Sequence, residues 1–304
     1  MDNMIIVSLS EEQLEETAAF ISSCQNLEES FVAWLGFSKE EIKSQLLTLE
    51  LPYKESCFIA IQDSVVSAFL GIYVSEQQFT FRFLGPFIAA HLDWQQTAYK
   101  LFNTLSKRIS AHLQTAKVAF YGENANCKTF YEANHFELYN AEKTLIFSRD
   151  SVGDLAKFEN PPIKLRSYKS SDYDRFLQIH PSGAYFTASE VTSRISEYHQ
   201  IIVAEVDEFT VGYVYFEMLP ADQYAEICFL NVASSFRNNG IGSLLLCKAI
   251  QEAFQKDWVN NIQISVRVDN KEADKLYTRI GFFEKNTILA LQRNLDKFPL
   301  GSRS

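Results

Sequence analysis

A glycine-containing loop between a strand and an apolar helix is the segment of this sequence best suited to chemistry. Residues 230–245 read as a strand ending near Val232, a loop with Gly240 and Gly242, and then a helix. The first N–H groups of a helix have no intrahelical partners and carry a partial positive charge, so they can bind a phosphate. Glycines lack a Cβ and accept positive φ, which lets the backbone approach such a ligand closely. The loop therefore predicts a pyrophosphate-binding site.

Two common phosphate loops do not fit this segment. The P-loop ends in Gly-Lys-Ser/Thr, which is absent here. The dinucleotide-binding fingerprint requires a third glycine, and position 245 is Leu. The glycine pair must therefore belong to another kind of site.

A second pattern follows the loop and identifies it. A strand at residues 262–269 leads to Asn270, a helix that carries Tyr277, and then Gly281 and Phe282. Together, the Arg-x-x-Gly-x-Gly loop and the Asn-x6-Tyr-x3-Gly-Phe segment closely resemble the GNAT superfamily of acyl-CoA-dependent N-acetyltransferases. The resemblance covers residues 163–295 and implies a domain that binds acetyl-CoA as co-substrate.

The resemblance also implies a role for individual residues. Glu226, on the strand before the loop, would be the general base, with Glu217 as second choice, and Tyr277 the general acid for the CoA thiolate. The N–H of Val232 would polarise the acetyl carbonyl, and Asn270 would hydrogen-bond the pantetheine. The residues expected to bind acetyl-CoA are Leu230, Val232, Arg237, Asn238, Asn239, Gly240, Ile241, Gly242, Ser243, Asn270 and Tyr277. A solvated carboxylate at a strand end and a core tyrosine are the alternative readings of Glu226 and Tyr277.

The N-terminal half repeats part of this pattern. Asn124 and Tyr131 have the spacing of Asn270 and Tyr277, at an offset of 146 residues, and the same offset places Phe83 on Phe229. This indicates two tandem domains of one fold. The same offset places Gly240 on Trp94, Gly242 on Gln96 and Arg237 on His91. We therefore expect a degenerate first domain that does not bind CoA.

The remaining pattern predicts an α/β fold, of the α+β mixed-sheet type, for both domains. Strands are expected at 5–8, 58–61, 65–74, 79–85, 117–121, 163–167, 201–206, 211–217 and 226–232. Helices are expected at 11–22, 38–49, 95–113, 172–179, 188–198 and 243–254. Gly153 and the Pro161-Pro162 pair mark a linker at 150–162, which gives domains at 1–150 and 151–304.

Charge and cysteine content limit the partners and the compartment. A net charge of −10 and a pI near 5.1 argue against nucleic acid. Five scattered cysteines fit neither a zinc site nor a disulfide framework, so we expect no metal and a cytoplasmic location. No apolar stretch is long enough to span a membrane. Packing of the two domains as a pseudo-dimer predicts a monomer, or else a weak homodimer.

Two functions of different classes follow from these observations. The first is acetyl-CoA-dependent transfer of an acetyl group to a primary amine of a small molecule or peptide, by direct attack in a ternary complex. Acceptor specificity is then expected in residues 179–198. The alternative is a non-catalytic acyl-CoA-binding sensor or scaffold. Intact Tyr277 and Asn270 favour the enzyme.

Overall fold

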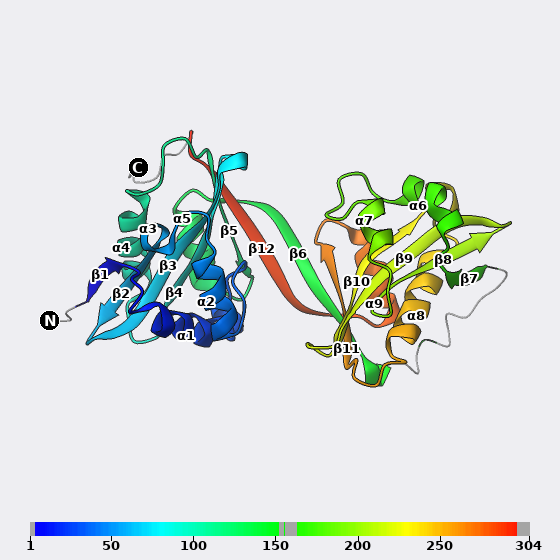
Figure 1. Cartoon of the computed structure of the whole chain (residues 1–304), viewed down its shortest axis with the longest axis horizontal. Helices are drawn as coiled ribbons and strands as arrows, with labels where there is room; N and C mark the ends of the chain where they lie inside the picture. The colour runs from blue at the N-terminus through cyan, green and yellow to red at the C-terminus, as the bar shows by residue number, and fades with distance from the viewer. Residues whose placement is uncertain (1–3, 152–154, 156–162, 297–304) are drawn as a thin grey trace. The chain divides into compact units, whose positions relative to one another are not determined.

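The protein consists of two compact α/β units. The computed structural model describes residues 4–151, 155 and 163–296. Unit 1 comprises Met1–Ala141 and Asn286–Ser304, and unit 2 comprises Glu142–Lys285. Each unit contains one mixed sheet with helices packed against it (Figure 1).

The sheet of unit 1 has the order β1-β2-β3-β4-β5-β12, in which only β4 and β5 are parallel. Its strands are β1 (Ile5–Ser8), β2 (Cys57–Gln62), β3 (Val65–Ser75), β4 (Thr80–Ile88), β5 (Thr115–Tyr121) and the later part of β12 (Phe283–Asn294). Its helices are α1 (Leu14–Gln25), α2 (Lys39–Leu47), α3 (Tyr53–Ser56), α4 (Trp94–Ser106) and α5 (Ala125–Ala133). Helix α4 packs on β2 and β3 and buries Leu101 and Leu105 in the core of this unit.

The sheet of unit 2 has the corresponding order β7-β8-β9-β10-β11-β6, with β10 and β11 parallel. Its strands are β7 (Lys164–Ser167), β8 (His199–Val206), β9 (Phe209–Leu219), β10 (Tyr224–Val232), β11 (Asn261–Arg267) and the later part of β6 (Glu137–Ser148). Its helices are α6 (Tyr173–Ile179), α7 (Ala188–Ser193), α8 (Ile241–Ala253) and α9 (Lys271–Ile280).

Strand β9 supplies side chains to two separate cores of unit 2. Val214 and Phe216 pack with residues of α8, whereas Tyr213 and Tyr215 pack with Phe176 of α6 and with α7. This follows from the alternation of side chains along a strand. The sheet is therefore covered on both faces, by α8 on one and by α6 and α7 on the other.

Each sheet is completed by a strand that follows the helix of the other repeat. Ile288–Asn294 of β12 pair with β5 in unit 1, and residues 142–148 of β6 pair with β11 in unit 2. The predicted division into 1–150 and 151–304 differs from these units for this reason. The strands β6 and β12 were not predicted, and most of the predicted linker lies outside the described residues.

Most of the other predicted elements are present, with boundaries that shift by a few residues. The predicted helices 95–113 and 188–198 end early, at Ser106 and Ser193. After Ser193 the chain turns back because the N–H of Ser196 donates to the carbonyl of His199, where β8 begins. Residues 107–114 and 194–198 form turns and irregular backbone that lead into β5 and β8.

The internal repeat is present, but its offset is not constant. It is 146 for α5 and α9, which begin at Ala125 and Lys271. The strands before them differ: Thr80 pairs with Thr115, whereas Tyr224 pairs with Asn261, so β4 and β10 are related by 144 residues. Helices α4 and α8 are related by 147 residues. The predicted alignments of Phe83 with Phe229 and of Trp94 with Gly240 are therefore wrong, because short insertions lie between these elements.

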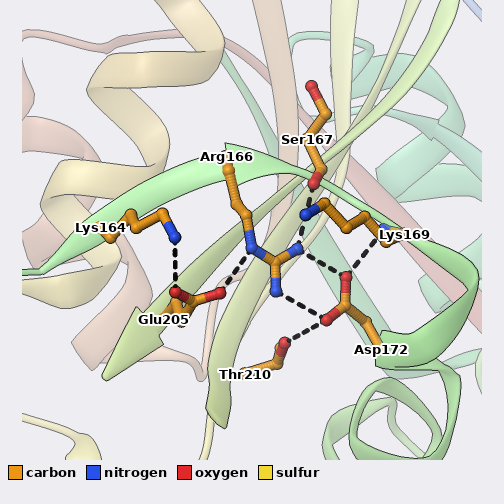
Figure 2. A network of polar contacts seen from close by, with 7 residues as sticks. All are labelled: Lys164, Arg166, Ser167, Lys169, Asp172, Glu205 and Thr210. Carbon is orange, nitrogen blue, oxygen red and sulfur yellow. Dashed lines mark hydrogen bonds and ion pairs between the residues drawn. The ribbon is translucent and has the colours of Figure 1, made fainter. Parts of the chain in front are cut away.

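A buried ion-pair network fixes the first strand of unit 2 (Figure 2). The Arg166 guanidinium donates to both carboxylate oxygens of Asp172, at 2.7 and 2.8 Å, and to Glu205 at 2.6 Å. Asp172 also accepts from Thr210 of β9 at 3.0 Å, and Glu205 from Lys164 at 2.9 Å. The network thereby joins β7, β8, β9 and the start of α6.

Candidate functional site

The two parallel strands of unit 2 separate halfway along their length. Pairing of β10 with β11 ends at Ile227 and Ile264, although both strands continue. The register of β10 against β9 shifts at the same place, between Ile227 and Phe229. The second half of β10 thus has one edge that β11 leaves open.

The backbone N–H of Val232 points to this open edge. Ala233 donates its N–H to the carbonyl of Val211 at 2.8 Å, and Val232 is the register partner of Gly212. Since hydrogen-bonded and non-hydrogen-bonded pairs alternate in an antiparallel ladder, the N–H of Val232 faces away from β9. It is therefore available to a ligand atom between the separated strands.

Helix α8 begins at the same place with an uncapped N-terminus. Gly240, the N-cap residue, has a φ of +79° and no side chain, and an added Cβ would meet nothing within 4 Å. The first intrahelical bond is donated by Leu244 to the carbonyl of Gly240. The N–H groups of residues 241–243 therefore have no acceptor within the helix, which is the arrangement that the predicted anion site requires.

A cleft of about 560 Å³ contains this helix end and the open edge of β10. Its lining includes nine of the residues predicted to bind acetyl-CoA: Leu230, Val232, Arg237, Asn238, Gly240, Ile241, Gly242, Ser243 and Asn270. Asn239 and Tyr277 are not among the lining residues. The amide of Asn270 also caps α9, accepting from the N–H of Ala273 at 3.2 Å.

Two cations in the cleft were missed by the sequence analysis. Lys275 and Arg279 lie one turn apart on α9 and both line the cleft. Arg279 donates to the hydroxyl of Ser243 at 2.6 Å, which brings its charge to the first turn of α8. The spacing of Lys271, Lys275 and Arg279 at intervals of four residues is the signal that could have found this basic face.

The two predicted base candidates are neighbours on β10 and β9. Glu226 is the register partner of Glu217. Glu217 accepts from the Tyr215 hydroxyl at 2.5 Å and from Arg194 at 3.0 Å. Burial, with a further contribution from the charge of Glu217, raises the pKa of Glu226 above its ordinary value. The basicity of the Glu226 carboxylate is thus increased, and this residue lies just before the strands separate.

Tyr277 lies in the core beneath the cleft. Its side chain is 7% exposed and packs against the ring of Phe282. Burial raises the pKa of Tyr277 to about 12, so its hydroxyl keeps its proton at neutral pH. It can act as a proton donor but not as a base.

A hydrogen-bonded chain connects the cleft to the loop between α6 and α7. Asn231, which lines the cleft, donates from Nδ2 to the Tyr213 hydroxyl at 3.0 Å. His180 donates from Nε2 to the carbonyl of Phe186 at 2.8 Å, and its Nδ1 lies 2.7 Å from the Tyr213 hydroxyl, within hydrogen-bond distance. Tyr185 of the same loop stacks on Phe229 of β10. These contacts hold the loop that the sequence assigns to the acceptor, and none was visible as a sequence motif because the partners are far apart in the chain.

The equivalent helix of unit 1 has a different N-terminus. Asp93 is the N-cap of α4, and its carboxylate accepts from the N–H of Gln96 at 2.9 Å. Asp93, rather than Trp94, therefore occupies the position of Gly240. Trp94 instead packs edge-on against Phe130. The Tyr131 hydroxyl, at the position of Tyr277, donates to the carbonyl of Gly85 at 2.8 Å.

Within the described ranges, no group of three or more His, Cys, Asp or Glu side chains is arranged to hold a metal ion. Likewise, none of the described helices is long and apolar enough to cross a membrane.

Comparisons with known proteins agree with this geometry. Residues 163–282 match the model of the acetyltransferase (GNAT) family. An uncharacterized N-acetyltransferase of Methanocaldococcus jannaschii is 28% identical over 157 residues, which is 50% of this chain and 66%, just under two thirds, of that relative.

Two solved structures resemble nearly the whole chain. A GCN5-related N-acetyltransferase from Sphaerobacter thermophilus has a TM-score of 0.67 at 14% identity, with 96% of each chain covered. A tandem GNAT protein from the clavulanic acid biosynthesis pathway has a TM-score of 0.64 at 12% identity, covering 99% of this chain and all of that one. At these identities the likeness concerns the fold, and it confirms the predicted mixed-sheet α/β class.

Proposed function

We propose that this chain, whose residues 163–282 match the GNAT-family model, uses acetyl-CoA to acetylate a primary amine of a small molecule or peptide. The transfer is a direct attack in a ternary complex. The observation that carries this proposal is the uncapped start of α8, which opens into a cleft where β10 and β11 separate.

The cleft has the donors that a bound acetyl-CoA requires. The N–H groups of residues 241–243 bind the pyrophosphate, with Gly240 allowing the close approach. Arg237, Lys275 and Arg279 supply positive side chains at the same end. Asn270 contacts the pantetheine, which lies between the separated strands.

The transfer itself needs a base, an oxyanion donor and an acid. Glu226 accepts a proton from the ammonium group of the acceptor, directly or through water, and the free amine then attacks the thioester carbonyl. The N–C bond forms, the C–S bond breaks, and the N–H of Val232 stabilises the charge on the carbonyl oxygen. Tyr277 donates a proton to the departing thiolate, and the proton that the attacking nitrogen loses as the amide forms restores the Tyr277 hydroxyl through water.

Unit 1 takes no part in this chemistry in our proposal. The carboxylate of Asp93 occupies the helix terminus that would receive the pyrophosphate, and like charges exclude one another there. We therefore assign a single acetyl-CoA site, in unit 2.

The decisive experiment measures thiol release from acetyl-CoA by the full chain over a panel of primary amines, beside calorimetric titration of acetyl-CoA. Tyr277→Phe should reduce kcat by about 10²-fold with the acetyl-CoA Kd unchanged. Binding of acetyl-CoA without turnover on any amine would leave the sensor as the function, and absence of binding would refute both. A wild-type rate for Tyr277→Phe would limit Tyr277 to packing.

A further inference from the structure

Unit 1 contains a pocket built around an arginine. The pocket has a volume of about 270 Å³, and its lining residues are Trp34, Leu35, Gln45, Thr48, Leu49, Tyr73, Arg82 and Leu84. The guanidinium carbon of Arg82 lies 5.2 Å from the centre of the Trp34 ring and 5.7 Å from that of Tyr73. Arg82 has no ion pair with any residue in the described part of the chain. A cation thus lies close to two aromatic rings, in a pocket that three leucines, Gln45 and Thr48 complete.

Arg82 occupies a position in the sheet of unit 1 that can be compared with a position in unit 2. Arg82 is the partner of Tyr73 on β3, two residues after the Thr80–Thr115 pair that begins the parallel ladder. In unit 2 the residue two positions after Tyr224 is Glu226, the proposed base. Unit 1 therefore has a cation at the place where unit 2 has the carboxylate of Glu226, so the two positions favour ligand groups of opposite charge.

The wall of the pocket is held in place by a buried amide. Gln25 is 1% exposed; its Nε2 donates to the carbonyls of Val32 and Leu35 at 2.7 and 2.9 Å, and its Oε1 accepts from the N–H of Val32. The N–H of Ala33 donates to the carbonyl of Ala119. These contacts hold Trp34 between them at a φ of +75°, a conformation that a tryptophan rarely adopts. Strain that the surroundings impose in this way is typical of ligand sites.

A second cation lies next to Arg82. Lys117 of β5 is its register partner, so both side chains leave the same face of the sheet. The ammonium of Lys117 lies 5.6 Å from the ring of Tyr139. This face of unit 1 thus favours an anion.

We infer that unit 1 has a ligand site of its own, in which Arg82 binds the carboxylate of a small organic acid and the rings of Trp34 and Tyr73 enclose its apolar body. Arginine matches a carboxylate with two parallel hydrogen bonds, and the aromatic and leucine side chains favour an apolar substituent.

Calorimetric titration of the full chain with benzoate, hexanoate and the neutral isostere benzamide tests this inference. Benzoate or hexanoate should bind at one site per chain, at least tenfold more tightly than benzamide. Arg82→Gln should weaken that binding at least tenfold, whereas Arg108→Gln, which removes the same charge elsewhere in unit 1, should leave it unchanged.

The wild-type comparison does not depend on how the variants fold, and their thermal unfolding is measured beside it. Absence of binding by both acids, equal affinity for benzoate and benzamide, or an equal loss in the two variants would overturn the proposal. Because no acyl transfer is measured, the result is independent of the function proposed for unit 2.

Discussion

Asp93 and Gly240 occupy the same position, the N-cap, in the equivalent helices α4 and α8, but only Asp93 places a carboxylate over the helix terminus. In unit 1 the terminal N–H of Gln96 is satisfied within the chain. In unit 2 the N-cap has no side chain, and the corresponding N–H groups face a cleft. One residue thus separates a capped helix from an anion site.

An aspartate at the N-cap of α8, as in α4 of unit 1, should weaken the binding of acetyl-CoA to unit 2. In Gly240→Asp, the new carboxylate lies where the pyrophosphate would bind, so we expect the Kd for acetyl-CoA to rise at least tenfold, or about 1.4 kcal/mol. Gly240→Asn should have a smaller effect because it adds no charge. Calorimetric titration of the full-length variants measures both.

Gly183→Asp is the matched control for this change. Gly183 has a φ of +80° and, like Gly240, open space around its Cβ position. The same strain and charge are added there, away from the helix terminus, so acetyl-CoA affinity should stay at the wild-type value. An equal loss in Gly183→Asp would mean that strain or net charge, rather than the local anion, weakens binding.

The pH dependence of turnover should identify the base. Burial, and after it the charge of Glu217, raises the pKa of Glu226. A base acts in its ionised form, so kcat should be full above this raised pKa and fall as the pH decreases through it. Glu226→Gln should lower kcat by about 10²-fold and abolish this acidic limb.

Glu217→Gln tests which of the two neighbouring carboxylates, Glu217 or Glu226, is the base. It removes the neighbouring negative charge, so the acidic limb should move to lower pH while turnover persists. If instead the limb disappears in Glu217→Gln and remains in Glu226→Gln, the base is Glu217.

The Arg166 network should make unit 2 sensitive to acid. Hydrogen bonds from Arg166 lower the pKa of Asp172, and those from Lys164 and Arg166 lower the pKa of Glu205. Stability from a carboxylate with a lowered pKa is present above its unfolded pKa and is lost as the pH falls through its folded pKa. We expect Asp172→Asn to cost about 3 kcal/mol at pH 7, because it leaves a largely buried arginine poorly paired.

Urea unfolding at pH 7 and pH 3 measures this cost. The difference between Asp172→Asn and the wild type should be smaller at pH 3 than at pH 7, because the stability that comes from the lowered pKa of Asp172 is lost progressively as the pH falls. Asp269→Asn, in an exposed pair with Arg267, serves as control and should change stability little at either pH. A loss equal to that control would show that the network contributes nothing.

The later part of β6, which completes the sheet of unit 2, predicts which fragment of the chain is stable. Phe147 of β6 is fully buried in unit 2 and packs against Phe282 and Phe254. Residues 142–285 should therefore unfold cooperatively and at a higher temperature than residues 149–285, which lack this strand segment. Circular dichroism on heating compares the melting temperatures of the two fragments. Equal values would argue against a structural role for residues 142–148 of β6.

Local residue patterns were sufficient to predict which residues line the cleft of unit 2. The glycine loop and the following Asn and Tyr lie on consecutive elements, and their spacing along the chain determines which side chains meet. Nine of the predicted binding residues accordingly line the cleft. Tyr277 was correctly placed on α9, but only the packing of that helix decides that its side chain points into the core.

The sequence by itself determined the fold class, the repeat and the uncapped helix terminus of unit 2, because these depend on residue types that are close together in the chain. Only the tertiary structure decided that β6 and β12 complete the two sheets, that Asp93 rather than Trp94 corresponds to Gly240, and that Arg82 corresponds to Glu226. Strand pairing joins residues distant in sequence, and insertions of one or two residues between elements change every alignment that a single offset would predict.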